Sequence, residues 1–341
     1  MERLLLALIA MVPDSFLSLC YGLKPVVIDG QRLNSKARLL CDIDRKTATP
    51  VRETPVETTR ANMERLAGAL AGKSPKLHSV HDIEIPTDFG ALPARLYKPV
   101  DSPSLPVLVY YHGGGYIRGS LNSHDGLCAR FAKYGGFAVL SVDYRLAPEH
   151  KFPAAVDDAV AAFNWAVHHG AEHGLDPKKV AVGGDSSGGC LAAAVAQQVK
   201  SKGDAQPVFQ MLLYPTLDAH LTAKSYQLFE DGFFLTYDRI RDYRDMYLNN
   251  ASERDDFRAS PILNRDLTGL PPALIITAGF DPLRDEAEDY AKALQAAGVG
   301  VGMVRFPAMV HGFMSMTALL PQAEKAIHQA AEALRHVFEA E

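Results

Sequence analysis

One serine in the chain stands between two glycines, each two residues away, in the stretch Gly184-Asp-Ser-Ser-Gly188. A serine in this pattern sits on a sharp turn between a strand and a helix, where its hydroxyl is exposed for nucleophilic attack. The glycine spacing selects Ser186 over the adjacent Ser187. A glycine-rich turn of this kind can also bind phosphate, but neither G-x-G-x-x-G nor G-K-[ST] is present. The stretch therefore indicates acyl-transfer chemistry with Ser186 as the nucleophile.

A serine hydroxyl is a poor nucleophile until a base takes its proton. In chains with this serine turn, an acid follows the serine and the base comes last. His328 and His336 fall inside an amphipathic helical pattern near the end of the chain. His311, in Met309-Val-His-Gly-Phe313, instead comes directly after the last expected strand. We therefore expect His311 to be the base.

The base needs an acid that orients its imidazole ring and stabilises the charged form. The stretch Phe280-Asp-Pro-Leu-Arg-Asp-Glu286 offers three carboxylates after an expected strand. Asp281 comes first and falls in the loop, whereas Asp285 and Glu286 fall in the first turn of the next helix, where the helix dipole favours acids. Asp281 is the expected acid, and Asp285 is the alternative.

Three consecutive glycines, in His112-Gly-Gly-Gly115, directly follow the apolar run at residues 105–111. Three glycines are conformationally costly to order, because glycine loses more freedom on folding than any other residue. A tight turn, a phosphate cradle, or a site for a developing oxyanion would each require exposed backbone at this point.

The remaining pattern alternates strands and helices. Nearly continuous apolar runs predict buried strands, and helical patterns lie between them. The expected strands are 105–111, 137–143, 179–184, 208–213, 272–278 and 300–306, after a hairpin at 80–97. The expected helices are 123–134, 153–169, 187–201, 284–297 and 321–338. This alternation predicts an α/β fold with a mostly parallel central sheet flanked by helices.

Two segments depart from the alternation and predict a helical cap. Residues 1–75 look helical and irregular, and about sixty residues separate the strand ending at Tyr214 from the next one. An insertion this long is usually a lid. We therefore divide the chain into an N-terminal cap segment at 1–75 and a catalytic domain at 76–341, with an inserted cap segment at 216–262.

Composition excludes several classes of protein. The formal net charge of −5 argues against nucleic acid as a partner. The four cysteines show no CxxC pair, so no metal site is expected. No apolar run reaches the ~18–20 residues of a membrane span. The apolar run within residues 1–12 favours a retained amphipathic helix over a cleaved signal, so we expect a cytoplasmic protein, with export left open.

Taken together, the motifs resemble the hormone-sensitive-lipase-like (bacterial family IV) carboxylesterases of the α/β-hydrolase fold, which are related to arylacetamide deacetylase. The matching stretches are His112-Gly-Gly-Gly115, Asp143-Tyr-Arg-Leu-Ala-Pro-Glu149, Gly184-Asp-Ser-Ser-Gly188, Asp281-Pro-Leu-Arg-Asp-Glu286 and His311-Gly-Phe313. They run in the family's order over residues 78–341. One departure is Ser187, where the family more often has alanine.

The resemblance implies hydrolysis of short- to medium-chain acyl esters through an acyl-enzyme, without a metal or organic cofactor. It also implies that an oxyanion hole is formed by the backbone N–H groups of Gly113, Gly114 and Ser187. The partner would be a small ester, and a homodimer stays open. Amidase or lactonase activity shares this chemistry, and a non-catalytic receptor on the same fold is an alternative that the three triad residues disfavour.

The sequence predicts the residues of the substrate pocket less directly than those of the triad. Tyr116 and Asp185 lie next to the catalytic motifs, and Phe233, Phe234 and Leu235 lie in the inserted cap segment. We expect these five residues to line the pocket. The alternative is that the cap residues form the cap's own core.

Overall fold

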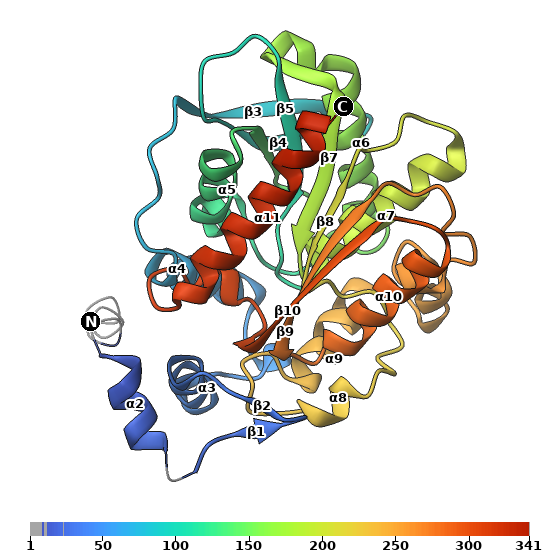
Figure 1. Cartoon of the computed structure of the whole chain (residues 1–341). Helices are drawn as coiled ribbons and strands as arrows, with labels where there is room; N and C mark the ends of the chain where they lie inside the picture. The colour runs from blue at the N-terminus through green and yellow to red at the C-terminus, as the bar shows by residue number, and fades with distance from the viewer. Residues whose placement is uncertain (1–8, 10–11, 23, 341) are drawn as a thin grey trace.

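In the computed structural model, which describes residues 9, 12–22 and 24–340, helices cover both faces of an eight-stranded sheet (Figure 1). The strands are β3 (Ser79–Thr87), β4 (Gly90–Lys98), β5 (Leu105–Tyr111), β6 (Ala138–Val142), β7 (Leu175–Asp185), β8 (Gln210–Leu213), β9 (Ala273–Phe280) and β10 (Val301–Val310). Their order is β10-β9-β8-β7-β5-β6-β4-β3. The strands from β5 to β10 pair in parallel, and β4 joins β6 antiparallel, which confirms the predicted fold class.

The helices that flank the sheet lie close to their predicted positions. They are α5 (Leu121–Gly135), α6 (Ala154–His169), α7 (Ser187–Lys202), α10 (Arg284–Ala296) and α11 (Pro321–Ala340), with the 3-10 turns η2 (Gly170–His173) and η5 (Phe313–Ser315). Figure 1 shows α5 and α11 side by side across the sheet.

Alternation along the strands sends side chains into two separate cores. In β7, Val180 and Val182 pack into the core shared with α6, α7 and α10. Ala181, between them, packs into the core shared with α5 and α11. Because both faces are buried, the strands read as continuous apolar runs, which is why the sequence located them well.

The two segments assigned to the cap contain the remaining elements. The N-terminal part holds α2 (Asp14–Tyr21), β1 (Val27–Ile28), β2 (Gln31–Arg32), α3 (Ser35–Thr47), η1 (Val51–Glu53) and α4 (Val56–Leu70). The later part holds α8 (Ser225–Leu228), α9 (Tyr237–Tyr247), η3 (Ala251–Asp255) and η4 (Pro261–Leu263). The helix expected within residues 1–12 falls mostly outside the described residues. Among the helices described, none is long and apolar enough to cross a membrane.

Ion pairs join these two parts of the chain. Arg52 Nε lies 2.7 Å from Asp242 Oδ1, and Arg52 Nη2 lies 2.8 Å from Asp245 Oδ2. Arg239 Nη1 lies 2.9 Å from Asp44 Oδ2. Helix α9 is thereby linked to both α3 and η1, although almost 200 residues separate the partners along the chain.

A buried carboxyl group connects the start of α10 to the segment after β8. Glu286 Oε1 accepts from the Leu217 N–H at 2.7 Å, and Oε2 accepts from the Tyr226 hydroxyl at 2.7 Å. Burial raises the pKa of Glu286 to about 8, and the two hydrogen bonds only partly oppose this. The neutral acid is therefore favoured in the folded protein at neutral pH.

This raised pKa predicts a pH-dependent stability. The ordinary pKa of 4.5 rises to about 8 on folding, so the contribution of Glu286 is complete below about pH 4.5 and disappears as pH rises through about 8. Glu286→Gln keeps a neutral side chain of similar shape but cannot titrate. Urea denaturation of both proteins between pH 5 and 8 should show the wild type losing stability relative to the variant, on the order of 1 kcal/mol per pH unit. A constant difference across this range would contradict the assignment.

Candidate active site

Ser186 occupies the sharp turn between β7 and α7. Its φ of 56° and ψ of −119° are unfavourable for a residue with a side chain, and such a conformation costs about 1–3 kcal/mol. The flanking glycines allow the turn to pack closely. A Cβ at Gly188 would lie 1.9 Å from the Tyr111 carbonyl oxygen, and one at Gly184 would lie 2.4 Å from the same atom. The G-x-S-x-G spacing therefore reflects close backbone packing of this turn against the end of β5.

His311 lies between Ser186 and Asp281. Its Nε2 is 3.0 Å from Ser186 Oγ, and its Nδ1 is 2.8 Å from Asp281 Oδ2. An ionised carboxylate only accepts hydrogen bonds, so Nδ1 carries the proton and Nε2 accepts from the serine hydroxyl. Asp281 is fully buried, and its other oxygen accepts from the Leu283 N–H at 2.9 Å. This arrangement fixes the ring and its tautomer for proton transfer from Ser186.

The three residues meet because their strands end at one edge of the sheet. Ser186 follows β7, Asp281 follows β9, and His311 follows β10, so all three lie at the carboxyl ends of parallel strands, where ligands of such sheets bind. Asp285, the alternative acid, instead pairs with Arg284 Nε at 2.7 Å. The structure thus brings together the three residues that were expected from the sequence.

The glycine triplet runs along the same pocket, but its amides differ in what they bind. The Gly113 N–H donates to Asp185 Oδ1 at 2.9 Å, and Gly113 does not line the pocket. The prediction that Gly113 contributes to an oxyanion hole is therefore wrong, because a buried carboxylate already accepts from its N–H. Gly114 and Gly115 do line the pocket. The Gly115 N–H donates to Ser187 Oγ at 3.0 Å.

Asp185 holds the first glycine of the triplet in place by accepting a hydrogen bond from the Gly113 N–H. Besides the Gly113 N–H, it accepts from the Tyr110 hydroxyl at 2.7 Å, and His124 Nε2 lies 3.3 Å away. Burial acts to raise the pKa of Asp185, but these partners outweigh burial and the pKa is lowered. Asp185 was expected to bind substrate. It lines the pocket, but its oxygens already bind groups of the protein, so it is better suited to hold the loop.

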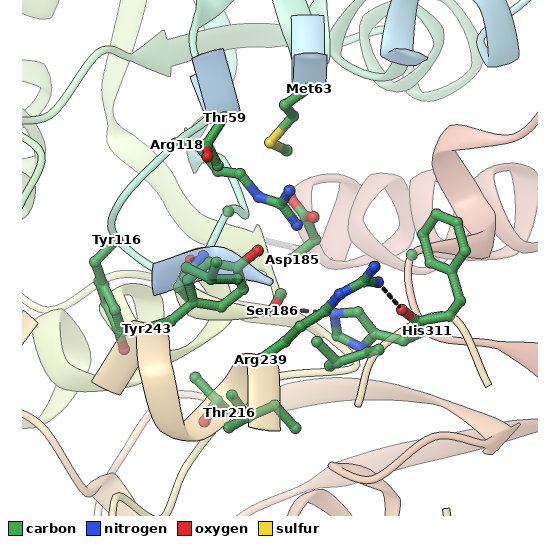
Figure 2. A pocket seen from close by; sticks show the side chains of 18 of the residues that line it. Thr59, Met63, Tyr116, Arg118, Asp185, Ser186, Thr216, Arg239, Tyr243 and His311 are labelled. Carbon is green, nitrogen blue, oxygen red and sulfur yellow. Dashed lines mark hydrogen bonds between the residues drawn. The ribbon is translucent and has the colours of Figure 1, made fainter. Parts of the chain in front are cut away.

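A cavity of about 380 Å³ adjoins Ser186 and His311 (Figure 2). Besides Asp185, the expected substrate-binding residues Tyr116, Phe234 and Leu235 line it. The prediction for Phe233 is wrong, because its ring packs against Phe229 and Phe280 with ring centroids 5.4 and 5.5 Å away. Phe233 therefore belongs to a small apolar core beside the pocket and not to its wall.

The structure adds pocket residues that the sequence did not single out. Those labelled in Figure 2 are Thr59, Met63, Arg118, Thr216, Arg239 and Tyr243. Part of this set carries a recognisable signal, since Thr59, Met63 and Leu66 recur at the spacing of one helix face on α4. Arg118 and Arg239 carry no such signal, because a lone arginine in a loop or helix usually faces solvent.

Comparison with known proteins agrees with this geometry. A family model described as the alpha/beta hydrolase fold matches residues 108–315. The chain is 43% identical to the carboxylic ester hydrolase LipN of Mycobacterium tuberculosis over 305 residues, which cover 87% of this chain and 81% of that protein. It is 36% identical to the ethyl acetate hydrolase of Pseudomonas putida over 291 residues, which cover 84% of this chain and 92% of that protein.

The solved structures that resemble this chain are also those of ester hydrolases. A hyperthermophilic esterase from the archaeon Pyrobaculum calidifontis superposes with a TM-score of 0.86 at 38% identity, covering 90% of this chain and 99% of that chain. An ester hydrolase from the metagenome of Lake Arreo, solved with a bipyridine phosphonate derivative, superposes with a TM-score of 0.87 at 35% identity, covering 92% and 100%. The likeness to arylacetamide deacetylase stays a prediction. The chain belongs to the hormone-sensitive-lipase-like family of α/β hydrolases.

Proposed function

We propose that the protein is a carboxylesterase that hydrolyses short- to medium-chain acyl esters, with Ser186, His311 and Asp281 as its catalytic triad. The observation that carries this proposal is the continuous hydrogen-bonded path from the Ser186 hydroxyl through His311 to the buried Asp281. The relatives named as ester hydrolases support the same reaction.

The reaction proceeds in two halves. In the first, Ser186 Oγ attacks the ester carbonyl carbon while His311 Nε2 takes the hydroxyl proton. The tetrahedral intermediate then collapses, the bond to the alcohol oxygen breaks, and His311 returns the proton to that oxygen. In the second half, His311 deprotonates a water molecule that attacks the acyl-enzyme, which releases the carboxylic acid and restores the Ser186 hydroxyl. Asp281 stabilises the imidazolium ion that forms in each half.

Backbone N–H groups would stabilise the oxyanion. The Ser187 N–H lies in the first turn of α7, so it has no acceptor within the helix. Gly114 lines the pocket, and none of the described residues accepts a hydrogen bond from its N–H. The Gly115 N–H could join these two donors if the Ser187 hydroxyl rotates away. We therefore propose that the backbone N–H groups of Gly114 and Ser187 form the core of the oxyanion hole. Gly115, and not Gly113, would supply the third N–H group.

The two segments at 1–75 and 216–262 would act as the cap. Helices α4 and α9 both contribute pocket-lining side chains, including Met63 and Tyr243. A cover of this kind excludes water from the reaction and strengthens electrostatic interactions inside. The division of the chain into a cap and a catalytic domain stays a prediction.

We further propose that the protein acts in the cytoplasm on small dissolved esters. Three of its cysteines, Cys41, Cys128 and Cys190, are buried free thiols, which suits a reducing compartment. A homodimer stays a prediction. Amide or lactone hydrolysis would use the same groups, and a receptor role would leave the aligned triad without a purpose.

Replacing Ser186 tests the nucleophile directly. Ser186→Ala should lower kcat on p-nitrophenyl butyrate by about 10⁴-fold or more, because no hydroxyl remains to form the acyl-enzyme. Ser187→Ala is the discriminating neighbour. It should change kcat by less than about tenfold, because its proposed contribution comes from the backbone N–H. Turnover that survives in Ser186→Ala but is lost in Ser187→Ala would contradict the proposal.

The cavity predicts the preferred acyl chain. Each methylene that enters the apolar part of the pocket gains about 0.8 kcal/mol, and the cavity of about 380 Å³ lies near the lower end of the range for ligand pockets, about 300–1,000 Å³. Among p-nitrophenyl acetate, butyrate, hexanoate and palmitate, kcat/KM should be highest for butyrate or hexanoate. It should be lower by about tenfold or more for palmitate. A maximum at palmitate would show that the pocket opens into a longer channel.

A further inference from the structure

Arg118 places a cation on the wall of the catalytic pocket. It follows the glycine triplet, and its backbone N–H donates to the Gly114 carbonyl at 3.3 Å. Its side chain extends into the pocket that Ser186 and His311 also line (Figure 2). The base of this side chain is thus held by the same loop that carries the proposed oxyanion hole.

The guanidinium of Arg118 has no acidic partner among the described residues. Its Nε is buried without a hydrogen-bond partner. Its contact is with the ring of Tyr243, whose centroid lies 5.0 Å from the guanidinium carbon. Asp185 lines the same pocket, but its oxygens are engaged by Tyr110, Gly113 and His124. Among the described residues, no ion pair therefore joins Arg118 to Asp185 or to any other carboxylate.

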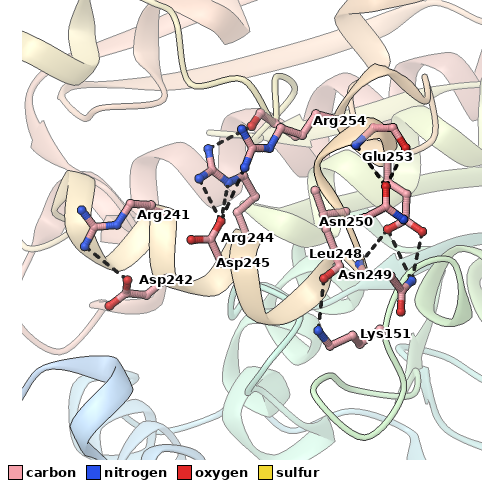
Figure 3. A network of polar contacts seen from close by, with 12 residues as sticks. Lys151, Arg241, Asp242, Arg244, Asp245, Leu248, Asn249, Asn250, Glu253 and Arg254 are labelled. Carbon is pink, nitrogen blue, oxygen red and sulfur yellow. Dashed lines mark hydrogen bonds and ion pairs between the residues drawn. The ribbon is translucent and has the colours of Figure 1, made fainter.

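The other arginines of the pocket lining have partners. Arg239 pairs with Asp44 at 2.9 Å. Arg244 pairs with Asp245 at 2.8 Å, a contact that Figure 3 shows within the polar network of α9. Arg65 Nη2 donates to Asn62 Oδ1 at 3.2 Å. Within the described pocket lining, Arg118 is therefore the arginine whose guanidinium has no hydrogen-bond or ion-pair partner in the protein, which leaves its terminal N–H groups without an acceptor.

We propose that Arg118 binds a carboxylate carried by the substrate, so that the preferred substrates are monoesters with a free carboxylate at their other end. The planar guanidinium matches a carboxylate with two parallel hydrogen bonds. A single guanidinium suits a single negative charge better than a dianionic phosphate. This inference rests on the proposed esterase function and specifies its substrate class.

Two pairs of esters test the inference, because the carboxylate could lie on either side of the ester bond. Monomethyl adipate and methyl heptanoate differ in the charge of the acyl side. The acetate esters of 4-hydroxybenzoate and of 4-methylphenol differ in the charge of the alcohol side. Hydrolysis is followed by acid release at constant pH for the wild type, Arg118→Gln, Arg118→Lys and Arg335→Gln. Arg335 is the matched control, a half-buried arginine on α11 that does not line the pocket and whose Nε is likewise buried without a hydrogen-bond partner.

In at least one pair, Arg118→Gln should lower kcat/KM for the carboxylated ester by about 10- to 100-fold, the usual effect of losing a charge-assisted hydrogen bond. The neutral ester should change by less than about threefold, Arg118→Lys should recover part of the loss, and Arg335→Gln should change neither ester. Equal changes for the charged and neutral members of both pairs would overturn the inference. If the wild type hydrolyses none of the four esters, the proposed function itself fails.

A second measurement covers the case in which Arg118→Gln does not fold. 6-Oxoheptanoate is compared with 6-oxoheptanamide, and 4-(2-oxopropyl)benzoate with 4-(2-oxopropyl)benzamide, as competitive inhibitors of the wild-type enzyme acting on methyl heptanoate. In each compound a ketone replaces the ester carbonyl, so the two members of a pair differ only in the charge at the far end. The carboxylate should bind about tenfold or more tightly than the amide if Arg118 recognises it. Equal inhibition constants would overturn the inference without touching the esterase proposal.

Discussion

The close packing of the serine turn against the end of β5 is the constraint on which the site depends. There is no room for a side chain at Gly184 or Gly188, because the Tyr111 carbonyl occupies that space. This packing holds Ser186 at a positive φ and directs the start of α7 toward the pocket. The end of β5 also leads into the glycine triplet. The packing of the serine turn against this strand end therefore fixes the positions of both the nucleophile and the proposed oxyanion donors. The strain at Ser186 is offset by the large core on either side of the sheet.

Much of this arrangement could be predicted from the sequence because its signals are local. Buried parallel strands read as apolar runs, and the serine turn reads as a glycine spacing. The positions of Asp281 and His311 followed from their places directly after strands. Their convergence was predictable since parallel strands end at one edge of the sheet.

The errors arose where position depends on packing between distant segments. Gly113 was assigned to the oxyanion hole, but its amide is taken by Asp185, which lies 72 residues further along the chain. Phe233 and Phe234 are adjacent and both pack against the same small core, yet Phe234 lines the pocket and Phe233 does not. Neither the spacing of glycines nor the hydrophobicity of a side chain predicts whether a residue faces the pocket or packs against another part of the protein. The same holds for Arg118, whose importance is visible only once its lack of an acidic partner is known.

The central claim is that Ser186 is a nucleophile activated by His311. Reaction with diethyl p-nitrophenyl phosphate tests it, because the reagent transfers a diethylphosphoryl group to an activated serine and releases p-nitrophenolate. We predict one adduct per chain, located on Ser186 by tandem mass spectrometry of the peptide that also contains Ser187, and formed far more slowly in His311→Gln. An adduct on Ser187 or elsewhere, or an unchanged rate in His311→Gln, would contradict the account.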